Sequence, residues 1–492
     1  MYRGWFNRCS TAGMAGGILI ATGLPAGDAL AVPAFARQTG QNCVACHAGG
    51  QFPELTPYGR IFKLTGYTLG TRGLPLSVMG VATYTKTKNT DTTPGGGTPS
   101  ADFPKDGTPL FNTGSLFLAG KVTDNIGGFV QVTYNNYAGV SADGTHFAGH
   151  TSSDNLDLRY ADRFIDASRD LIVGLSLNNN PSVQDVFNSA PAWIYNYVPG
   201  STAQAGNVAT PLLSGGLAQN VAGLSAYAYW NKTLYAELGF YRTADKIFSF
   251  MSQGNDPMRG QAALRGLNPY FRLALTREWG PHNAMVGLMG MSADQYPDPT
   301  LPTGPVDRFR DIGLDAQYQY LLDPHTVTAQ LSYLHERHDY SGGSVCASLD
   351  QASNSSCSPG DPANLPSLQA ATNAADTIKL FRAKVSYVYQ AKYGGTLSYF
   401  NVSGSTNSLN QTSAVDPALG IQGSGGAGGN ATGNPGTTGW TAEVFWTPVQ
   451  YARVGLQYTL FTKFNGATDN YDGFGRNAKD NNTLFAYVWG AY

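Results

Sequence analysis

The feature that most constrains the fold is a period-two alternation of apolar and polar residues that recurs from residue 76 onward. In segment 234–241, one face carries Leu, Ala, Leu and Phe, and the other carries Tyr, Glu, Gly and Tyr. Segments 312–320 and 381–390 alternate in the same way. Such strands have one face suited to lipid and one suited to water, as in outer-membrane β-barrels. A strand of a soluble β-sandwich shows the same pattern, so the segments alone do not separate the two folds.

The lengths of the connections favour the barrel. We predict strands near residues 76–86, 113–122, 128–136, 155–163, 170–178, 221–230, 233–242, 269–278, 283–293, 309–321, 326–337, 378–390, 395–404, 439–447, 450–462 and 483–492. Short turns near 124–127, 230–232, 322–325 and 392–395 alternate with long polar loops near 87–112, 179–220, 243–268, 339–377, 405–438 and 463–482. Bacterial barrels have short periplasmic turns and long external loops, an asymmetry that a sandwich does not need. The sequence therefore predicts an all-β fold, an antiparallel transmembrane barrel of about sixteen strands with both termini periplasmic and long extracellular loops.

Composition excludes several other classes of protein. Only 13% of the 492 residues are charged and the net charge is −2, so a disordered chain or a nucleic-acid partner is not expected. A mean hydropathy of −0.21 argues against a bundle of transmembrane helices. The 60 Gly and 28 Tyr residues suit a β protein with a polar interior.

Residues 1–31 have the pattern of a secretory signal peptide. Arg3 and Arg8 precede a small apolar stretch at 11–24, and residues 29–31 form an A-x-A cleavage site. A membrane anchor is the alternative interpretation. We expect export beyond the bacterial inner membrane, with a mature chain that starts at Val32.

The mature chain carries the motif C-x-x-C-H, formed by Cys43, Cys46 and His47. This is the attachment motif of c-type haem, in which the two thiols add to the haem vinyl groups and the histidine is the axial ligand. A C-x-x-C pair also occurs in redox dithiols and zinc sites. The chain has no second C-x-x-C to complete a zinc site and no thioredoxin-like βαβ pattern. The motif therefore predicts one covalently attached haem c.

Two further cysteines, Cys346 and Cys357, flank a stretch rich in Ser, Pro and Asn. In an oxidising compartment we expect them to form a disulfide, with metal binding as the alternative. Closure of a loop of this size stabilises a fold by about 3 kcal/mol.

The haem segment, residues 32–74, is too short to enclose a haem by itself, because chains of about forty residues rarely fold without further support. We therefore expect it to lie in the lumen of the barrel, residues 75–492, where the barrel wall completes the haem pocket and the haem divides the distance across the membrane. No Met and no His except His47 occurs between residues 32 and 74, so the second axial ligand is not assigned. Candidates elsewhere in the chain are Met79, Met251, Met258, Met285, Met289, Met291, His146, His150, His335 and His338. His282 and His325 lie at predicted periplasmic turns, on the wrong side for external iron.

The sequence around the motif resembles a known family. Residues 34–40 (AFARQTG) precede the motif and residues 55–67 (LTPYGRIFKLTGY) follow it. This stretch is similar to the cytochrome–porin fusion family, the outer-membrane monohaem c-type cytochromes that oxidise Fe(II) in iron-oxidising bacteria. The likeness covers about residues 33–67, and the rest resembles the family only in architecture. It implies that the cysteines and histidine of the motif hold the haem, and it suggests that Arg60 contacts a haem propionate.

The resemblance implies a function in electron transfer. Electrons from extracellular Fe(II) would pass through the haem to a periplasmic carrier, either a copper protein or a soluble cytochrome c. Two alternatives remain, an outward conduit to extracellular acceptors and a solute porin with a structural haem. Outer-membrane lipid is the expected surrounding, and the sequence assigns no Fe(II) site.

Overall fold

The computed structural model describes residues 33–50, 54–89, 107–140, 147–187, 209–253, 262–296, 302–341, 373–407, 415–416, 421–422, 430–473 and 475–492. Five expected features lie outside these residues: the signal peptide (1–31), Cys346, Cys357, His146 and Met258. Within the described ranges, no helix is long and apolar enough to cross a membrane.

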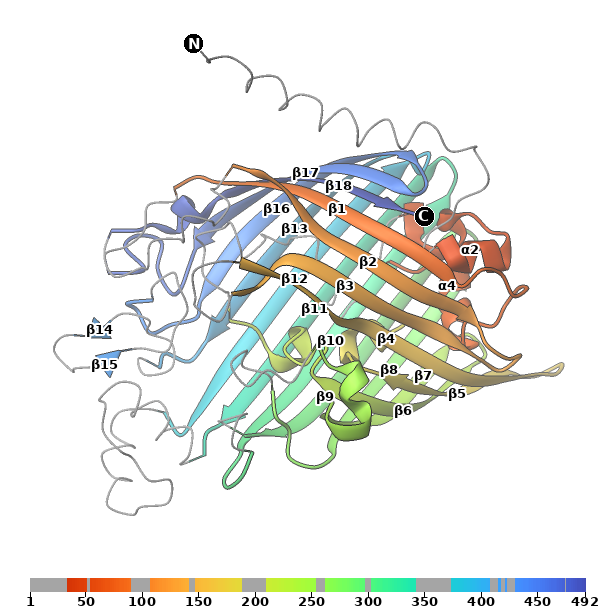
Figure 1. Cartoon of the computed structure of the whole chain (residues 1–492), viewed down its shortest axis with the longest axis horizontal. Helices are drawn as coiled ribbons and strands as arrows, with labels where there is room; N and C mark the ends of the chain where they lie inside the picture. Colours follow the sequence, from red (N-terminus) through yellow and green to blue (C-terminus); the bar gives the residue numbers. More distant parts are fainter. Residues whose placement is uncertain are drawn as a thin grey trace, which may run out of the picture.

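In the described part of the chain, sixteen antiparallel strands close into a barrel, as the sequence predicts (Figure 1). The barrel strands are β1 (Leu76–Thr87), β2 (Pro109–Lys121), β3 (Ile126–Val140), β4 (Phe147–Ile165), β5 (Asp170–Asn178), β6 (Val221–Trp230), β7 (Leu234–Thr243), β8 (Asn268–Trp279), β9 (His282–Gln295), β10 (Asp307–Leu322), β11 (His325–Asp339), β12 (Ala375–Tyr389), β13 (Tyr393–Gly404), β16 (Thr437–Val449), β17 (Ala452–Lys463) and β18 (Thr483–Ala491). A separate hairpin, β14 (Val415–Asp416) and β15 (Ile421–Gln422), belongs to the connection between β13 and β16.

The barrel closes because its first strand pairs on both sides. Met79 of β1 lies opposite Ser115 of β2 and also opposite Ala491 of β18. A closed sheet leaves no row of unpaired backbone groups in lipid. The faces follow the predicted alternation, since Leu238 of β7 is 58% exposed on the outside whereas its neighbour Glu237 is buried in the lumen. A closed barrel with an apolar outer face is the architecture of an outer-membrane protein.

The two ends of the barrel differ, as the sequence predicts. Turns of a few residues join the strands at one end, here called the short-turn end. These turns lie at 122–125, 166–169, 231–233, 280–281, 323–324, 390–392 and 450–451. The opposite end, here called the long-loop end, carries the longer connections. The C-terminus and the start of β1 both lie at the short-turn end (Figure 1).

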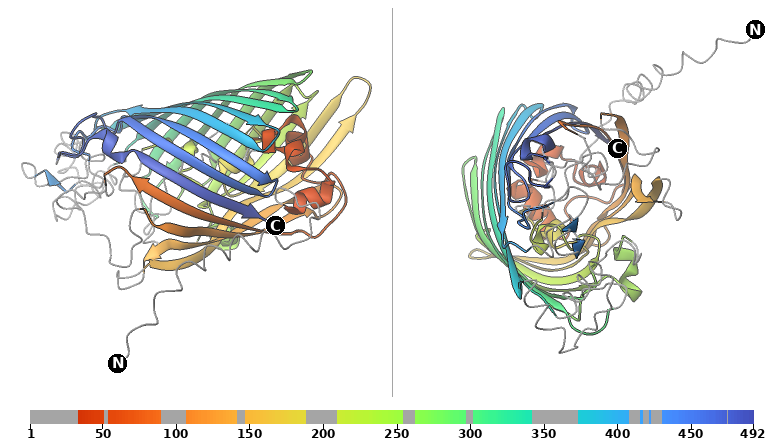
Figure 2. Two further views of the ribbon diagram at one scale, coloured as in Figure 1. Left: turned by 90° about the horizontal axis from the view of Figure 1, so that it is seen from above. Right: turned by 90° about the vertical axis from the view of Figure 1, so that its left-hand side faces the viewer.

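Two inserts occupy the lumen. The N-terminal insert enters from the short-turn end and contains α2 (Pro33–Thr39), α3 (Cys43–Cys46), the 3-10 turn η1 (Ala48–Gly50) and α4 (Pro57–Leu64). Figure 2 shows these helices inside the ring of strands. The second insert belongs to the β5–β6 connection and contains α5 (Pro181–Gln184) and η2 (Leu212–Ser214). Two further 3-10 turns lie in other connections, η3 (Lys246–Met251) and η5 (Ala478–Asn481).

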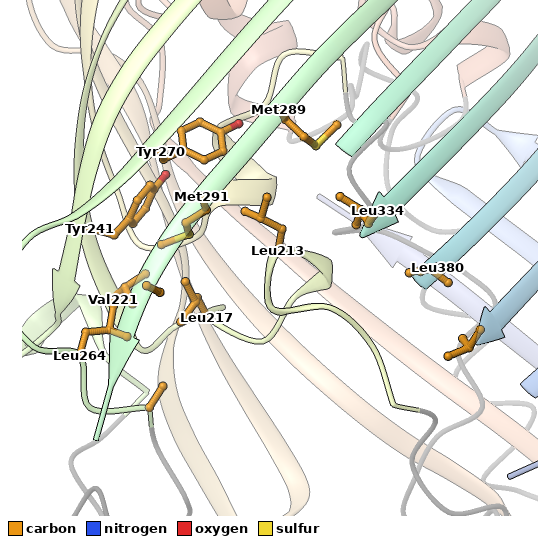
Figure 3. Packing of buried hydrophobic residues seen from close by; sticks show 13 residues of the cluster. Leu213, Leu217, Val221, Tyr241, Leu264, Tyr270, Met289, Met291, Leu334 and Leu380 are labelled. Atoms are coloured by element: carbon orange, nitrogen blue, oxygen red, sulfur yellow. The ribbon is translucent and has the colours of Figure 1, made fainter. Parts of the chain in front are cut away.

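The η2 turn of the second insert and the residues that follow it pack into the long-loop half of the lumen. Leu213 and Leu217 belong to a buried cluster with Tyr241, Met289 and Met291, which point inward from β7 and β9 (Figure 3). Hydrogen bonds to carboxylates also hold the insert. The backbone N–H of Leu212 donates to Glu336 at 2.6 Å, and the backbone N–H of Leu213 donates to Asp311 at 2.7 Å. The described parts of the β5–β6 connection are therefore packed in the barrel interior.

The two inserts meet inside the barrel. The Lys63 ammonium on α4 donates a hydrogen bond to the carbonyl oxygen of Val183 on α5. Phe187, which follows α5, lies between two guanidinium groups, with Arg60 at 5.6 Å and Arg272 at 5.4 Å from its ring centroid. Arg272 is itself held by two hydrogen bonds to Asp315 at 2.7 and 2.6 Å. The N-terminal insert therefore packs against the second insert.

Candidate functional site

The C-x-x-C-H motif forms a single tight turn. Cys43 to Cys46 make up α3, and the backbone N–H of His47 donates to the carbonyl oxygen of Cys43 at 2.8 Å. His47 then leaves the helix with an extended backbone (φ −120°, ψ 130°). The short spacing in sequence thus brings two thiols and one imidazole onto one turn, which is the donor set that the motif predicts.

A second segment holds this turn in place. The backbone N–H of Thr56 donates to the carbonyl oxygen of Cys46 at 2.9 Å, and His47 pairs with Leu55 in an antiparallel bridge. Thr56 also caps α4, because its hydroxyl oxygen accepts from the N–H of Gly59 at 3.1 Å while the hydroxyl donates to the carbonyl of Ala45. One threonine therefore fixes α4 relative to the motif.

Gly59 allows α3 and α4 to approach each other closely. A Cβ atom at position 59 would lie 2.2 Å from the carbonyl oxygen of Cys46, a distance that no side chain can occupy. Glycine lets the backbones of α3 and α4 touch because it has no Cβ.

The motif borders a cavity between the N-terminal insert and the barrel wall. Cys43, Cys46 and His47 all line it. Its apolar lining consists of Pro33, Phe35, Ala36, Leu55, Phe62, Val78, Met79, Phe117, Phe129, Val183, Trp489 and Ala491. The space between the lining atoms is about 1210 Å³ with the open mouth included. A largely apolar lining with a few polar groups is typical of cofactor pockets, so the chemistry of this lining fits a haem.

Aromatic rings form one side of the cavity. Phe35 of α2 stacks on Tyr67 with ring centroids 5.1 Å apart, and Phe62 of α4 meets both rings edge-on at 5.1 and 5.7 Å. The hydroxyl of Tyr67 donates to Asp157 Oδ2 at 2.7 Å, and its ring meets Phe129 of β3 at 6.1 Å. Rings from the insert and from the barrel therefore build the wall together.

Burial sets the protonation of two donor atoms of the motif, Cys46 and His47. Cys43 Sγ donates to the carbonyl oxygen of Gln450 at 3.3 Å, and burial raises the pKa of the Cys46 thiol to about 11. Burial, together with the positive charges of Arg453 and Lys63, lowers the pKa of His47 to about 3, so its imidazole is neutral. Neutral imidazole is the form that binds metals.

Ion pairing and hydrogen bonds fix the insert to the strands opposite β1. Glu54 is buried and pairs with Lys384 of β12. Gly49 approaches Val388 of the same strand so closely that a Cβ would lie 2.8 Å from its side chain. The Arg60 guanidinium donates to Asn283 Oδ1 at 2.9 Å and to Gln317 Oε1 at 3.3 Å.

Two expectations from the sequence need adjustment. Arg60 is not among the residues that line the cavity, and its guanidinium is engaged by the barrel wall, so its position does not favour contact with a propionate. The cavity also lies near the short-turn end, where β1 begins and β18 ends, so a group bound there would divide the distance across the membrane unevenly. The reason is the short segment that joins the insert to the barrel, because α4 ends at Leu64 and β1 already begins at Leu76.

The structure brings one of the candidate axial ligands to the cavity, namely Met79. Buried packing clusters hold Met251, Met285, Met289 and Met291. Of the histidines described outside the motif, His335 lies within β11 opposite Ile312 of β10, and the others lie near strand ends. His282 and His325 contact tyrosine hydroxyls at 2.7 and 2.8 Å. At the other end, His338 contacts Asp307 and His150 contacts a backbone carbonyl.

No cluster of three or more His, Cys, Asp or Glu side chains suited to a metal ion occurs among the described residues. The Fe(II) site therefore stays unassigned, as it is from the sequence.

Sequence reasoning missed several residues that build the site. Gln450, in the β16–β17 turn, holds Cys43 through its side chain and its backbone. Trp489 and Ala491 close the cavity from the last strand. Their inward positions follow from the alternation along β18, but the alternation does not say which strand faces the motif.

No family model and no curated protein matches the sequence. Among solved structures, the chain is similar to OmpF of Salmonella typhi in complex with daunomycin, at 10% identity and a TM-score of 0.44, over 85% of this chain and 97% of that chain. It is also similar to the outer-membrane channel DcaP of Acinetobacter baumannii (13% identity, TM-score 0.42, 85% and 96% covered) and to an anion-selective porin from Comamonas acidovorans (11%, 0.37, 85% and 99%).

Proposed function

We propose that the chain is an outer-membrane c-type cytochrome that takes electrons from extracellular Fe(II) and delivers them to a periplasmic electron carrier. The observation that carries the proposal is the convergence of Cys43, Cys46 and His47 on one apolar cavity inside the barrel. The haem that this donor set can hold would supply a one-electron couple. Each Fe(II) ion loses one electron to become Fe(III), and the carrier gains that electron.

The difference between the two ends of the barrel suggests which end faces the periplasm and which faces the outside. Outer-membrane barrels place short turns in the periplasm and long loops outside. With this orientation the cavity lies at the periplasmic side, where Gln41, Asn42 and Val44 of the insert are exposed. A copper protein or a soluble cytochrome c can dock there within reach of the cavity.

The two inserts within the barrel favour electron transfer over solute transport. A solute porin needs a continuous aqueous path, whereas electrons tunnel best through closely packed protein. The two inserts meet inside the barrel, where Lys63 donates a hydrogen bond to the Val183 carbonyl oxygen.

An anaerobic optical titration of the purified, oxidised full-length protein with Fe(II), at acidic and at neutral pH, tests the proposal. We expect sharp reduced c-type bands within the mixing time at one of the two pH values. Ready reduction by a strong low-potential donor but none by Fe(II) would point to an outward conduit or to a structural haem. Conductance in a planar bilayer then separates those two, because the solute porin predicts an open pore.

A further inference from the structure

This inference rests on the proposed haem attachment and concerns the side of the cavity that faces the motif. His47 is held against β12 and its neighbours through η1, where Gly49 meets Val388. The barrel lining of the cavity comes from β1, β2, β3 and β18. We propose that the thioether sulfur of Met79, on β1, is the second axial ligand of the haem iron.

The pleat of β1 aims Met79 into the barrel. Ser77, two residues earlier, is buried and accepts a hydrogen bond from the backbone N–H of Ala34 at 2.9 Å, so this face of β1 looks onto the N-terminal insert. Val78, between them, is 45% exposed on the outer face. Successive side chains of a strand point to opposite faces, so Met79 shares the inward face with Ser77.

Position 79 is also rigid. Its backbone pairs with Ser115 of β2 on one side and with Ala491 of β18 on the other. A site built on paired strands holds its side chains more precisely than a site built on loops. A ligand on β1 would therefore bind the iron without ordering a flexible segment.

Met79 differs from the other candidate methionines in its surroundings. Met251, Met285, Met289 and Met291 are at most 5% exposed and belong to hydrophobic clusters. Met79 is only partly buried although it lies inside the barrel, because it borders the cavity. Hydrophobic packing explains the positions of the four clustered methionines. It does not explain why a methionine at position 79 borders the cavity.

Three polar side chains of the lining are engaged elsewhere. The Lys63 ammonium donates to the Val183 carbonyl and lies 3.8 Å from Asp157 Oδ2. The Tyr67 hydroxyl donates to Asp157. The Gln131 amide donates to Ser115 and Thr133 and accepts from Asn155. Among the described histidines, His47 alone borders the cavity.

Methionine is also the chemically suitable ligand. A thioether is soft, and a Met/His pair raises the reduction potential of haem relative to other axial pairs. A high potential lets a haem accept electrons from Fe(II). The position of Met79 thus agrees with the inward direction of electron flow.

The test compares the full-length holoprotein with Met79→Leu, Met79→His and, as a matched control, Met289→Leu. The oxidised wild type should show the near-infrared sulfur-to-iron charge-transfer band, and its reduced form should resist CO. Met79→Leu should lose the band, bind CO and have a lower potential, with haem still covalently bound on a denaturing gel. Met79→His should keep a six-coordinate, low-spin spectrum without the band, and the control should match the wild type.

Two outcomes would overturn the assignment separately from the proposed function. If wild type carries covalent haem but is five-coordinate, or if Met79→Leu keeps the band, Met79 is not the ligand and the haem proposal stands. If wild type carries no covalent haem, the proposed function itself fails and the assignment fails with it.

Discussion

Glu54, which follows the C-x-x-C-H turn, forms an ion pair inside the barrel with Lys384 of β12. The Glu54 side chain is 1% exposed and that of Lys384 is 24% exposed, so the pair lies largely out of water. A contact between residues so far apart in sequence ties the N-terminal insert to the barrel wall. Because a buried carboxylate is costly when it loses its partner, this pair selects the docked position of the insert.

Lys384→Met should weaken the docking of the insert, since it leaves the Glu54 carboxylate buried without its cation. We expect a loss of about 2–3 kcal/mol, slightly below the range for fully buried pairs because Lys384 keeps some contact with water. The variant should show higher bilayer conductance and lower haem content. The exchange Glu54→Lys with Lys384→Glu should restore both, and Asp166→Asn, at an exposed ion pair, should have no effect. Equal conductance in all four proteins would show that the pair does not hold the insert.

Replacement of the motif cysteines tests the attachment. In the double variant Cys43→Ala and Cys46→Ala, haem should be absent from the protein band on a denaturing gel, because no thiol remains to form a thioether. Each single variant should keep a reduced haem content and show shifted reduced bands, since one vinyl group stays unmodified. The pair Cys346→Ala and Cys357→Ala is the matched control and should stain like the wild type. Covalent haem in the double variant would contradict the assignment.

Gly59→Ala should disturb the motif although it adds a single methyl group. Its Cβ would lie 2.2 Å from the carbonyl oxygen of Cys46, so α4 has to move away from α3. Overpacking of this kind costs about 1–3 kcal/mol. We expect a lower yield of covalent haem and a lower unfolding temperature. Gly73→Ala is the control, since its nearest neighbour would be 3.8 Å away, and similar losses in both variants would rule out the steric explanation.

Lys63 makes stability depend on pH in the alkaline range. Burial lowers its pKa from 10.5 to about 8, against the attraction of Asp157. The cost of burying the ammonium is fully present below pH 8, and it disappears as the pH rises towards 10.5, because the folded protein loses this proton first. The free energy of unfolding should therefore rise by about 3 kcal/mol across this window relative to Lys63→Met. Denaturant titrations of both holoproteins between pH 7.5 and 10.5 measure this difference, and parallel pH curves would refute it.

The barrel could be predicted from the sequence because the two patterns that indicate a barrel, strand alternation and connection length, are both local. Alternation along each strand fixes which face meets lipid, and connection length fixes which end carries the short turns. The predicted strands agree with the observed ones to within a few residues at most ends, and the larger differences are extensions, as at β4, which begins at Phe147. The composition of the C-x-x-C-H turn is equally local, so its donor set was predictable from three residues.

What only the tertiary structure decided is which distant residues face that turn. Periodicity shows that Met79 and Met289 both point inward, but it cannot say that Met79 borders the cavity while Met289 packs in a cluster near the long loops. It also could not place the cavity near the short turns, or show that Arg60 binds Asn283 and Gln317. These relationships depend on how a closed sheet of sixteen described strands curves around two inserts. The closure brings residues hundreds of positions apart into contact, and no local pattern in the chain records that pairing.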